Sequence, residues 1–253
     1  MFTVKWSAQL APQADCQGQW QVCSPKTVGN FTAVGYSFAR HLQGELDVPI
    51  GLLGCNWGGT RIEPWTTPSG FRSVPALKDI ADKLDTFPQK RDNGSINHQS
   101  ALALHNGMIS PINPYGIRGA LWYQGESNNG EGMLYYEKKK ALINGWRDIW
   151  NNKKMPFYFV QLAPYKYGGE QTRQAGIWKA QLATPLLTFI DRKFNRNRYS
   201  PRFKFVGNKR NWRALTSCFR VLNDHRSSNS SFHIANIRSE NSNLNFQRQA
   251  LGI

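Results

Sequence analysis

Three stretches of the chain are almost wholly apolar and have the length of a β-strand. They are VPIGLLGC (48–55), GIRGALWYQ (116–124) and PFYFVQLA (156–163). Successive side chains of a strand point to opposite faces of a sheet, so a run without alternation indicates burial on both faces. Strands of this kind are typical of a parallel sheet that helices cover on both sides.

Helical spacing flanks these strands. Apolar residues recur every three or four positions from Phe31 to Leu42 and again from Leu142 to Trp150. The alternation of strand and helix predicts an α/β fold with right-handed crossovers. Residues 66–100, which hold several prolines and glycines, are predicted to be an insertion with one short helix near 76–86.

A polar, glycine-rich segment follows each predicted strand. These segments are NWGGTRIEPW (56–65), GESNNGEG (125–132) and PYKYGGEQ (164–171). In an open α/β sheet, ligands bind outside the carboxyl ends of the strands, because the loops converge there. We therefore expect all three segments to meet on one rim of the sheet and to form a site.

Composition fits one sizeable domain followed by a segment of different character. The chain has 253 residues, 40% of them apolar, and a net charge of +16. Residues 191–253 hold 13 Lys and Arg against 3 Asp and Glu, whereas residues 1–190 hold 19 against 13. We predict a domain over 1–190 and a basic, Ser/Asn-rich, irregular tail over 191–253. Because most of the excess charge lies in the tail, nucleic-acid binding is a minor hypothesis, and we predict no nucleic-acid partner.

Features that would indicate other classes of protein are missing from the sequence. It holds no run of about 18 apolar residues, and its first residues lack the basic start and apolar core of an export signal. We predict neither a membrane span nor a signal peptide in this chain. The four cysteines form no CxxC pair, so no metal and no cofactor is predicted. Cys16 and Cys23 are compatible with a disulfide or with free thiols.

The diglycine after the first strand is a candidate for catalysis. Gly58 and Gly59 permit a tight turn whose backbone N–H groups approach a ligand oxygen, as an oxyanion hole requires. Trp57 and Trp65 flank this turn, and exposed indoles near such a rim can stack on sugar rings. The alternative is an ordinary turn in which Arg61 and its neighbour Glu63 are surface charges.

The loop after the second strand places several polar side chains directly behind a core strand. Gln124 can donate its amide N–H to a developing oxyanion, and Glu126 can orient a donor or accept a hydrogen bond from a sugar hydroxyl. In the alternative reading, Gln124 and Asn128 only satisfy backbone groups of the turn.

Four blocks of sequence carry a family resemblance. They read CSPKTVGNFTAVGYSFARHL, VPIGLLGCNWGGTRIEPW, HNGMISPINPYGIRGALWYQGESN and PFYFVQLAPY. In order and spacing they resemble the sialate O-acetylesterase family, a branch of the SGNH hydrolases, from about residue 2 to about residue 183. The resemblance implies a three-layer αβα, flavodoxin-like fold with a parallel sheet, and an acetylated carbohydrate as substrate. It also implies a periplasmic or extracellular location.

The resemblance further implies a mechanism and a set of residues. A serine attacks the acetyl carbonyl, a histidine takes its proton, and preorganised donors hold the oxyanion. By position in the motifs, the catalytic residues are Gly58, Gly59, Gln124 and Glu126. The substrate-binding residues expected beside them are Trp57, Arg61, Trp65 and Asn128.

The sequence departs from the family pattern where the nucleophile should be. The family's first core strand ends in a GQSNM block, and no such block occurs here. The sheet is therefore expected to be incomplete at the N-terminus and to expose two unpaired edges. Ser100, which follows His98 and Gln99, is interpreted as a loop residue, and Ser127 is no better placed as an attacking group.

The base is also missing from its expected position. The family places His-Pro where this chain has Ser200-Pro201. The segment NRYSP (197–201) can be encoded as AAC CGA TAT TCA CCC, and without its first base this reads Thr-Asp-Ile-His-Pro. We hypothesise that a base slip disrupted the reading frame and produced the basic tail. His225, which follows Asp224, is a weak alternative candidate for the base.

These observations give two main functional hypotheses. The first is a hydrolase that removes O-acetyl esters from sugars such as sialic acid, with this chain as a partial copy of weak or no activity. The second is a non-catalytic carbohydrate-binding remnant that uses its tryptophans. The sequence does not indicate the oligomeric state.

Overall fold

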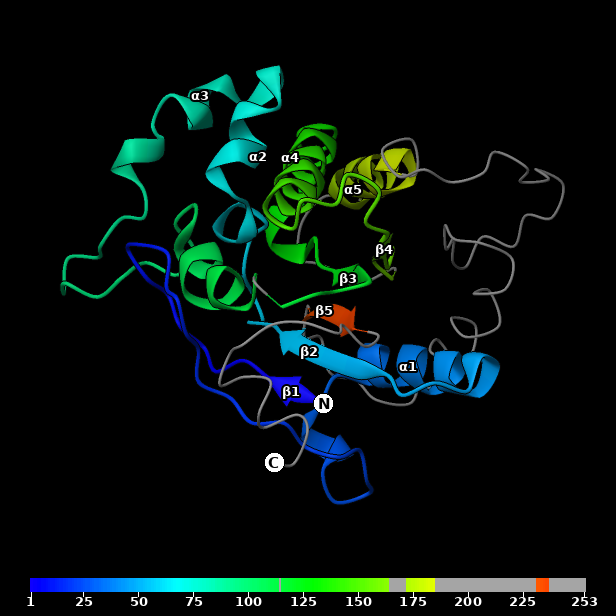
Figure 1. The fold of residues 1–253 in the computed structure, drawn as a ribbon. Coiled ribbons are helices and arrows are strands. Elements are labelled where there is room, and N and C mark those ends of the chain that lie inside the picture. Colours follow the sequence, from blue (N-terminus) through cyan, green and yellow to red (C-terminus); the bar gives the residue numbers. More distant parts are fainter. Residues whose placement is uncertain (114, 164–171, 185–230, 237–253) are drawn as a thin grey trace, which may run out of the picture.

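The computed structural model describes residues 1–113, 115–163, 172–184 and 231–236. Five strands form one sheet in the order β1-β2-β5-β3-β4 (Figure 1). The strands are β1 (Phe2–Thr3), β2 (Gly51–Cys55), β3 (Gly119–Tyr123), β4 (Phe157–Phe159) and β5 (Ser231–Asn236). The α-helices are α1 (Ala33–Leu46), α2 (Pro68–Arg72), α3 (Lys78–Ala81), α4 (Leu134–Ile149) and α5 (Thr172–Ala183).

The sheet is mixed, which corrects the prediction of a parallel sheet. β1 pairs with β2 and β3 pairs with β4 in parallel, but β5 runs antiparallel to both β2 and β3. The sequence predicts an irregular tail, and residues 231–236 of that tail instead form this strand. Because β5 pairs on both sides, the inner edges of β2 and β3 are hydrogen-bonded and not exposed. The remainder of the tail lies outside the described residues.

Helices lie on both faces of the sheet, as the continuous apolar runs predict. In Figure 1, α1 lies beside β2, whereas α4 and α5 lie beyond β3 and β4. The core on the α1 face joins Val34 and Phe38 of α1 to Leu52 of β2 and Leu121 of β3. The helical spacing from Phe31 to Leu42 is therefore confirmed. The helix itself begins at Ala33, after Phe31, and Thr32 caps it by accepting a hydrogen bond from Gly35 N at 3.3 Å.

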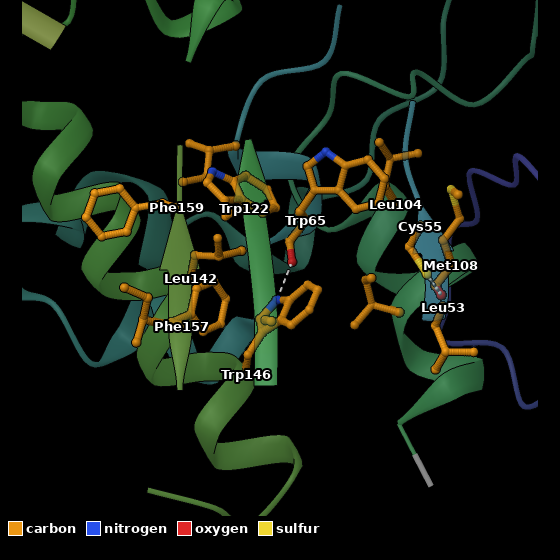
Figure 2. Close-up of a cluster of buried hydrophobic side chains, with 14 of the residues drawn as sticks. Leu53, Cys55, Trp65, Leu104, Met108, Trp122, Leu142, Trp146, Phe157 and Phe159 are labelled. Carbon is orange, nitrogen blue, oxygen red and sulfur yellow. Dashed lines mark hydrogen bonds between the residues drawn. The ribbon is translucent and has the colours of Figure 1, made fainter. Parts of the chain in front are cut away.

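The core on the α4 face is larger and contains three buried tryptophans (Figure 2). Trp122 of β3 meets Trp65 edge to face, with ring centroids 6.4 Å apart, and Trp146 of α4 donates its indole N–H to Trp65 O at 3.0 Å. Phe157 of β4 packs against the Trp146 ring. The apolar face predicted from Leu142 to Trp150 is confirmed, because it is the side of α4 that covers this core.

The insertion lies beside α4 rather than on the sheet. Within residues 66–100 the chain forms the short helices α2 and α3 together with 3-10 turns, and α2 packs against α4. The one short helix expected near 76–86 corresponds to α3 and the turns around it. Among the described residues, no helix has the length and apolar character needed to cross a membrane.

Candidate active site

The loop that follows β2 forms a tight turn held by Thr60. The Thr60 hydroxyl donates to Trp57 O at 2.7 Å and accepts the Trp65 indole N–H at 3.0 Å. Gly59 has φ +74°, a value that side chains with a Cβ rarely adopt, so the turn requires glycine there. Gly58 and Gly59 are both exposed, and within the described residues neither amide N–H has a hydrogen-bond partner.

The loop that follows β3 turns sharply and then forms a 3-10 helix over Glu126–Asn128. Gly125 lies at φ +156°, and a Cβ there would stand 3.0 Å from Leu162 Cδ1 and 3.1 Å from Gln181 Nε2. The chain therefore leaves the strand in a conformation and a space that only glycine fits. This exit directs Asn128 back towards the β2 loop.

Hydrogen bonds join these two loops, which confirms that they meet at one place. Ser127 Oγ donates to Gly59 O at 2.8 Å, and Asn128 Oδ1 accepts from Ile62 N at 3.0 Å. Gln124 Nε2 donates to Thr60 O at 3.1 Å. The third predicted loop, residues 164–171, lies outside the described residues.

Gln124 is buried, and its side-chain amide is fully bonded. Besides Thr60 O, its Nε2 donates to Asn128 Oδ1 at 2.8 Å, and its Oε1 accepts from Tyr135 Oη at 2.8 Å. The residue is 4% exposed. In this arrangement the amide holds the two loops together, and contact with a substrate oxygen would require one of these bonds to break.

A compact ionic network underlies the two loops. Lys138 Nζ, on α4, lies 2.7 Å from Glu63 Oε1 and 2.8 Å from Glu131 Oε2. Arg61 forms ion pairs with the same two carboxylates, and Asn128 Nδ2 donates to Glu63 Oε2 at 3.0 Å. Two cations and two carboxylates therefore compensate one another, and Asn128 connects them to the loops.

The network sets the protonation of Glu63. Burial alone would raise the pKa of this carboxyl, but the charge and hydrogen bond of Lys138, with hydrogen bonds from Asn128 and Arg61, lower the pKa to about 2. Glu63 is therefore ionised throughout the neutral range. The alternative reading of Glu63 as a surface charge is wrong, since its side chain is only 12% exposed.

The residues predicted to bind substrate differ in their exposure to solvent. Arg61 keeps a 42% exposed side chain at the edge of the network, and Asn128 is buried between the loops. Trp65 is 2% exposed and belongs to the core, so its faces are covered by protein rather than open to a sugar. Glu126 is half-buried in the β3 loop, and His225 lies outside the described residues.

Serine and histidine residues do not form a catalytic pair in the part of the chain that the structure describes, where no serine hydroxyl is hydrogen-bonded to a histidine ring. Ser100 is buried and its Oγ accepts from Gln89 N at 2.8 Å, in agreement with its interpretation as a loop residue. Cys16, Cys23 and Cys55 are free thiols. No group of His, Cys, Asp or Glu suited to a metal ion occurs among the described residues.

Sequence reasoning missed Glu131, Lys138 and Tyr135. Lys138 belongs to a run of three lysines (138–140), a pattern that usually indicates a solvated helix face. Glu131 lies seven residues earlier, before α4 begins, so helical spacing does not indicate this pair. The second carboxylate, Glu63, comes from the distant β2 loop.

Comparisons with known proteins place the chain among carbohydrate esterases. The family model of carbohydrate esterases described as sialic acid-specific acetylesterase matches residues 6–193. Human sialate O-acetylesterase is 35% identical over 57% of this chain, and the rat enzyme of the same name is 33% identical over 54%. These matches cover 29% and 31% of the relatives, so the chain spans less than a third of their length.

A solved structure shows the same fold. The crystal structure of a carbohydrate acetylesterase from Xanthomonas citri superposes with a TM-score of 0.62 at 34% sequence identity. The superposition covers 74% of this chain and 40% of that protein.

Proposed function

Because this chain belongs to the carbohydrate-esterase family of sialic acid-specific acetylesterases, we propose that it acts in the removal of O-acetyl groups from sugars such as sialic acid. The reaction is a serine-type acyl transfer, in which a hydroxyl oxygen attacks the acetyl carbonyl and the negative charge moves to the carbonyl oxygen. One observation carries the proposal. The loops that follow β2 and β3 are bonded into one unit, in which the Gly58 and Gly59 amide groups are exposed and have no hydrogen-bond partner among the described residues.

Each residue has a proposed role. The N–H groups of Gly58 and Gly59 stabilise the oxyanion, since donors fixed before the reaction need no reorganisation as charge develops. Gln124 and Asn128 position this turn through their bonds to Thr60 and Ile62. Arg61 and Glu126 line the approach to the turn, where a charged or hydroxylated sugar would lie.

Activity of this chain by itself is proposed to be weak. An oxyanion hole and substrate binding without nucleophile and base retain an acceleration on the order of 10³ to 10⁴ over water in the serine-protease template. We expect slow acetate release from an aryl acetate and from O-acetylated sialic acid, and a loss of that release in Gly59→Val, which cannot adopt the turn. Gly29→Val is the control, because a Cβ at Gly29 meets no atom within 4 Å. A wild-type rate equal to that of buffer contradicts the proposal.

The second candidate function is carbohydrate binding without catalysis. It is favoured by the lack of a serine–histidine pair in residues 1–113, 115–163 and 172–184, and by an exposed aromatic ring beside the turn, Trp6. A fluorophosphonate that labels activated serines distinguishes the candidates. Covalent labelling of the chain rules out the binding-only function.

The frame hypothesis is tested at the level of the gene. We propose that the DNA encoding residues 197–201 contains an overlapping Thr-Asp-Ile-His-Pro reading. Sequencing of the locus checks this directly, and an unbroken frame with no such overlap contradicts it. The periplasmic or extracellular location and the lack of a nucleic-acid partner also remain proposals, which cell fractionation and salt-dependent binding assays address.

A further inference from the structure

Three aromatic rings from distant parts of the chain form a continuous stack beside the diglycine turn. The Trp6 and Trp57 rings lie 5.0 Å apart with planes 12° from parallel, and the Trp57 and His98 rings lie 4.8 Å apart at 3°. Trp57 therefore has both faces covered. The sequence-based expectation that Trp57 stacks on a sugar places the contact on a ring whose faces are already occupied.

Trp6 is the outer member of this stack and is open to solvent. It is 61% exposed, the second highest value among the large exposed apolar residues of the described chain. Its position is nevertheless fixed, because its indole N–H donates to Asn56 O at 2.8 Å and its inner face rests on Trp57. A rigid indole loses little conformational entropy when a ligand covers it, so such a ring is suited to binding.

Both ends of the stack are attached to the turn that we assign to the oxyanion. Trp6 is bonded to Asn56, two residues before Gly58. His98 is followed by Gln99, whose Nε2 donates to Gly59 O at 2.8 Å and whose Oε1 accepts from Arg61 N at 3.0 Å. The distance between the exposed indole face and the Gly58–Gly59 amides is thus set by covalent and hydrogen-bonded connections.

We propose that the exposed face of Trp6 is a binding subsite for a pyranose ring of a glycan, next to the acetylated residue. The π-face of an indole, which is the electron-rich side of its quadrupole, attracts the C–H groups on the apolar face of a sugar ring, and the contact removes apolar surface from water. The position of this subsite next to the reacting acetyl group rests on the proposed function. Binding itself does not depend on catalysis.

Saturation-transfer NMR on the full-length chain tests the subsite with two probes that carry no acetyl ester, sialyllactose and xylotetraose. We expect saturation of the C–H protons of at least one sugar ring in the wild type. In Trp6→Ala the Kd should rise about tenfold, whereas Trp6→Phe, which keeps an aromatic face, should stay within about threefold. Leu46→Ala is the matched control, since Leu46 is also exposed (51%) but ends α1, before β2 begins.

The outcomes separate this subsite from the esterase proposal. Wild-type affinity in a folded Trp6→Ala protein overturns the subsite, and so does an absence of binding of both probes to the wild type. Trp6-dependent binding without any acetate release supports the subsite and contradicts the esterase function. Acetate release together with glycan binding that does not depend on Trp6 supports the esterase function and contradicts the subsite. A response to sialyllactose alone identifies an acidic glycan, and a response to xylotetraose alone a neutral one.

Discussion

Replacement of Lys138 by methionine is expected to lower the free energy of unfolding by about 3–5 kcal/mol. The Lys138 side chain is 5% exposed, and its ammonium group lies within 2.8 Å of carboxylate oxygens of both Glu63 and Glu131. Methionine fills a similar volume but leaves the two carboxylates with Arg61 as their remaining cation. Urea-induced unfolding at pH 7, followed by fluorescence, measures the loss.

Lys140→Met is the matched control on the same helix. Its ammonium group lies 3.6 Å from Glu137, and its side chain is 35% exposed, so we expect a change below about 1 kcal/mol. Equal effects of the two substitutions would contradict the assignment of Lys138 to a stabilising network. Glu63→Gln in the Lys138→Met background should recover part of the loss, since it removes one of the unpaired charges.

The same network predicts a pH dependence. The pKa of Glu63 is about 2 in the folded protein and near its usual value of 4.5 in the unfolded chain. The stabilisation is therefore complete above about pH 4.5 and is lost as the pH falls towards 2. The difference in stability between the wild type and Lys138→Met should narrow over this interval. A difference that stays constant between pH 5 and pH 2 would contradict the account.

Asn128→Leu is expected to have the second largest effect, about 3 kcal/mol of stability together with opening of the two loops. Asn128 Oδ1 accepts from Ile62 N and from Gln124 Nε2, and all three residues are buried. Leucine leaves Ile62 N and one of the two N–H groups of Gln124 Nε2 without a partner, while the bond from Gln124 Nε2 to Thr60 O remains. Hydrogen exchange of the Ile62 amide measures the opening locally, and it should accelerate more than exchange in β3.

Two variants show whether the bond rather than the bulk of Asn128 matters. Asn129→Leu is the control, because Asn129 Oδ1 has no hydrogen-bond partner in the described part of the chain, and we expect a change within about 0.5 kcal/mol. Asn128→Asp keeps the accepting oxygen but adds a third carboxylate beside Glu63 and Glu131. It should destabilise more at pH 7 than at pH 4. Similar exchange at Ile62 in Asn128→Leu and wild type would show that the loops are joined in another way.

Local pattern was sufficient for three of the five strands. The apolar runs at 48–55, 116–124 and 156–163 contain β2, β3 and β4, and their lack of alternation anticipated cores on both faces. The strand at residues 231–236 was missed because its pairing with β2 and β3 depends on residues far away in the chain. That tail segment is short and lies in a Ser/Asn-rich context that carries no strand signal.

The site was predicted at the level of loops and only in part at the level of side chains. The diglycine turn and the Gln124 loop do meet, since both follow strands of one sheet. Indole rings, however, occur both in cores and on surfaces. The sequence analysis placed Trp65 on the surface as a sugar-binding ring, whereas Trp65 is buried in the core. The ring that is both exposed and fixed is Trp6, which sequence reasoning did not consider.

The sequence by itself determined the family, the elements β2, β3, β4, α1 and α4, and the glycines that make the two turns, because these depend on short-range spacing and backbone conformation. Only the tertiary structure decided which polar groups are available. Gln124 is bonded on every side, Lys138 is enclosed by two carboxylates, and Trp57 is covered by Trp6 and His98. Each of these contacts joins residues that are far apart in the chain. Burial and pairing of a side chain therefore depend on the tertiary structure around it.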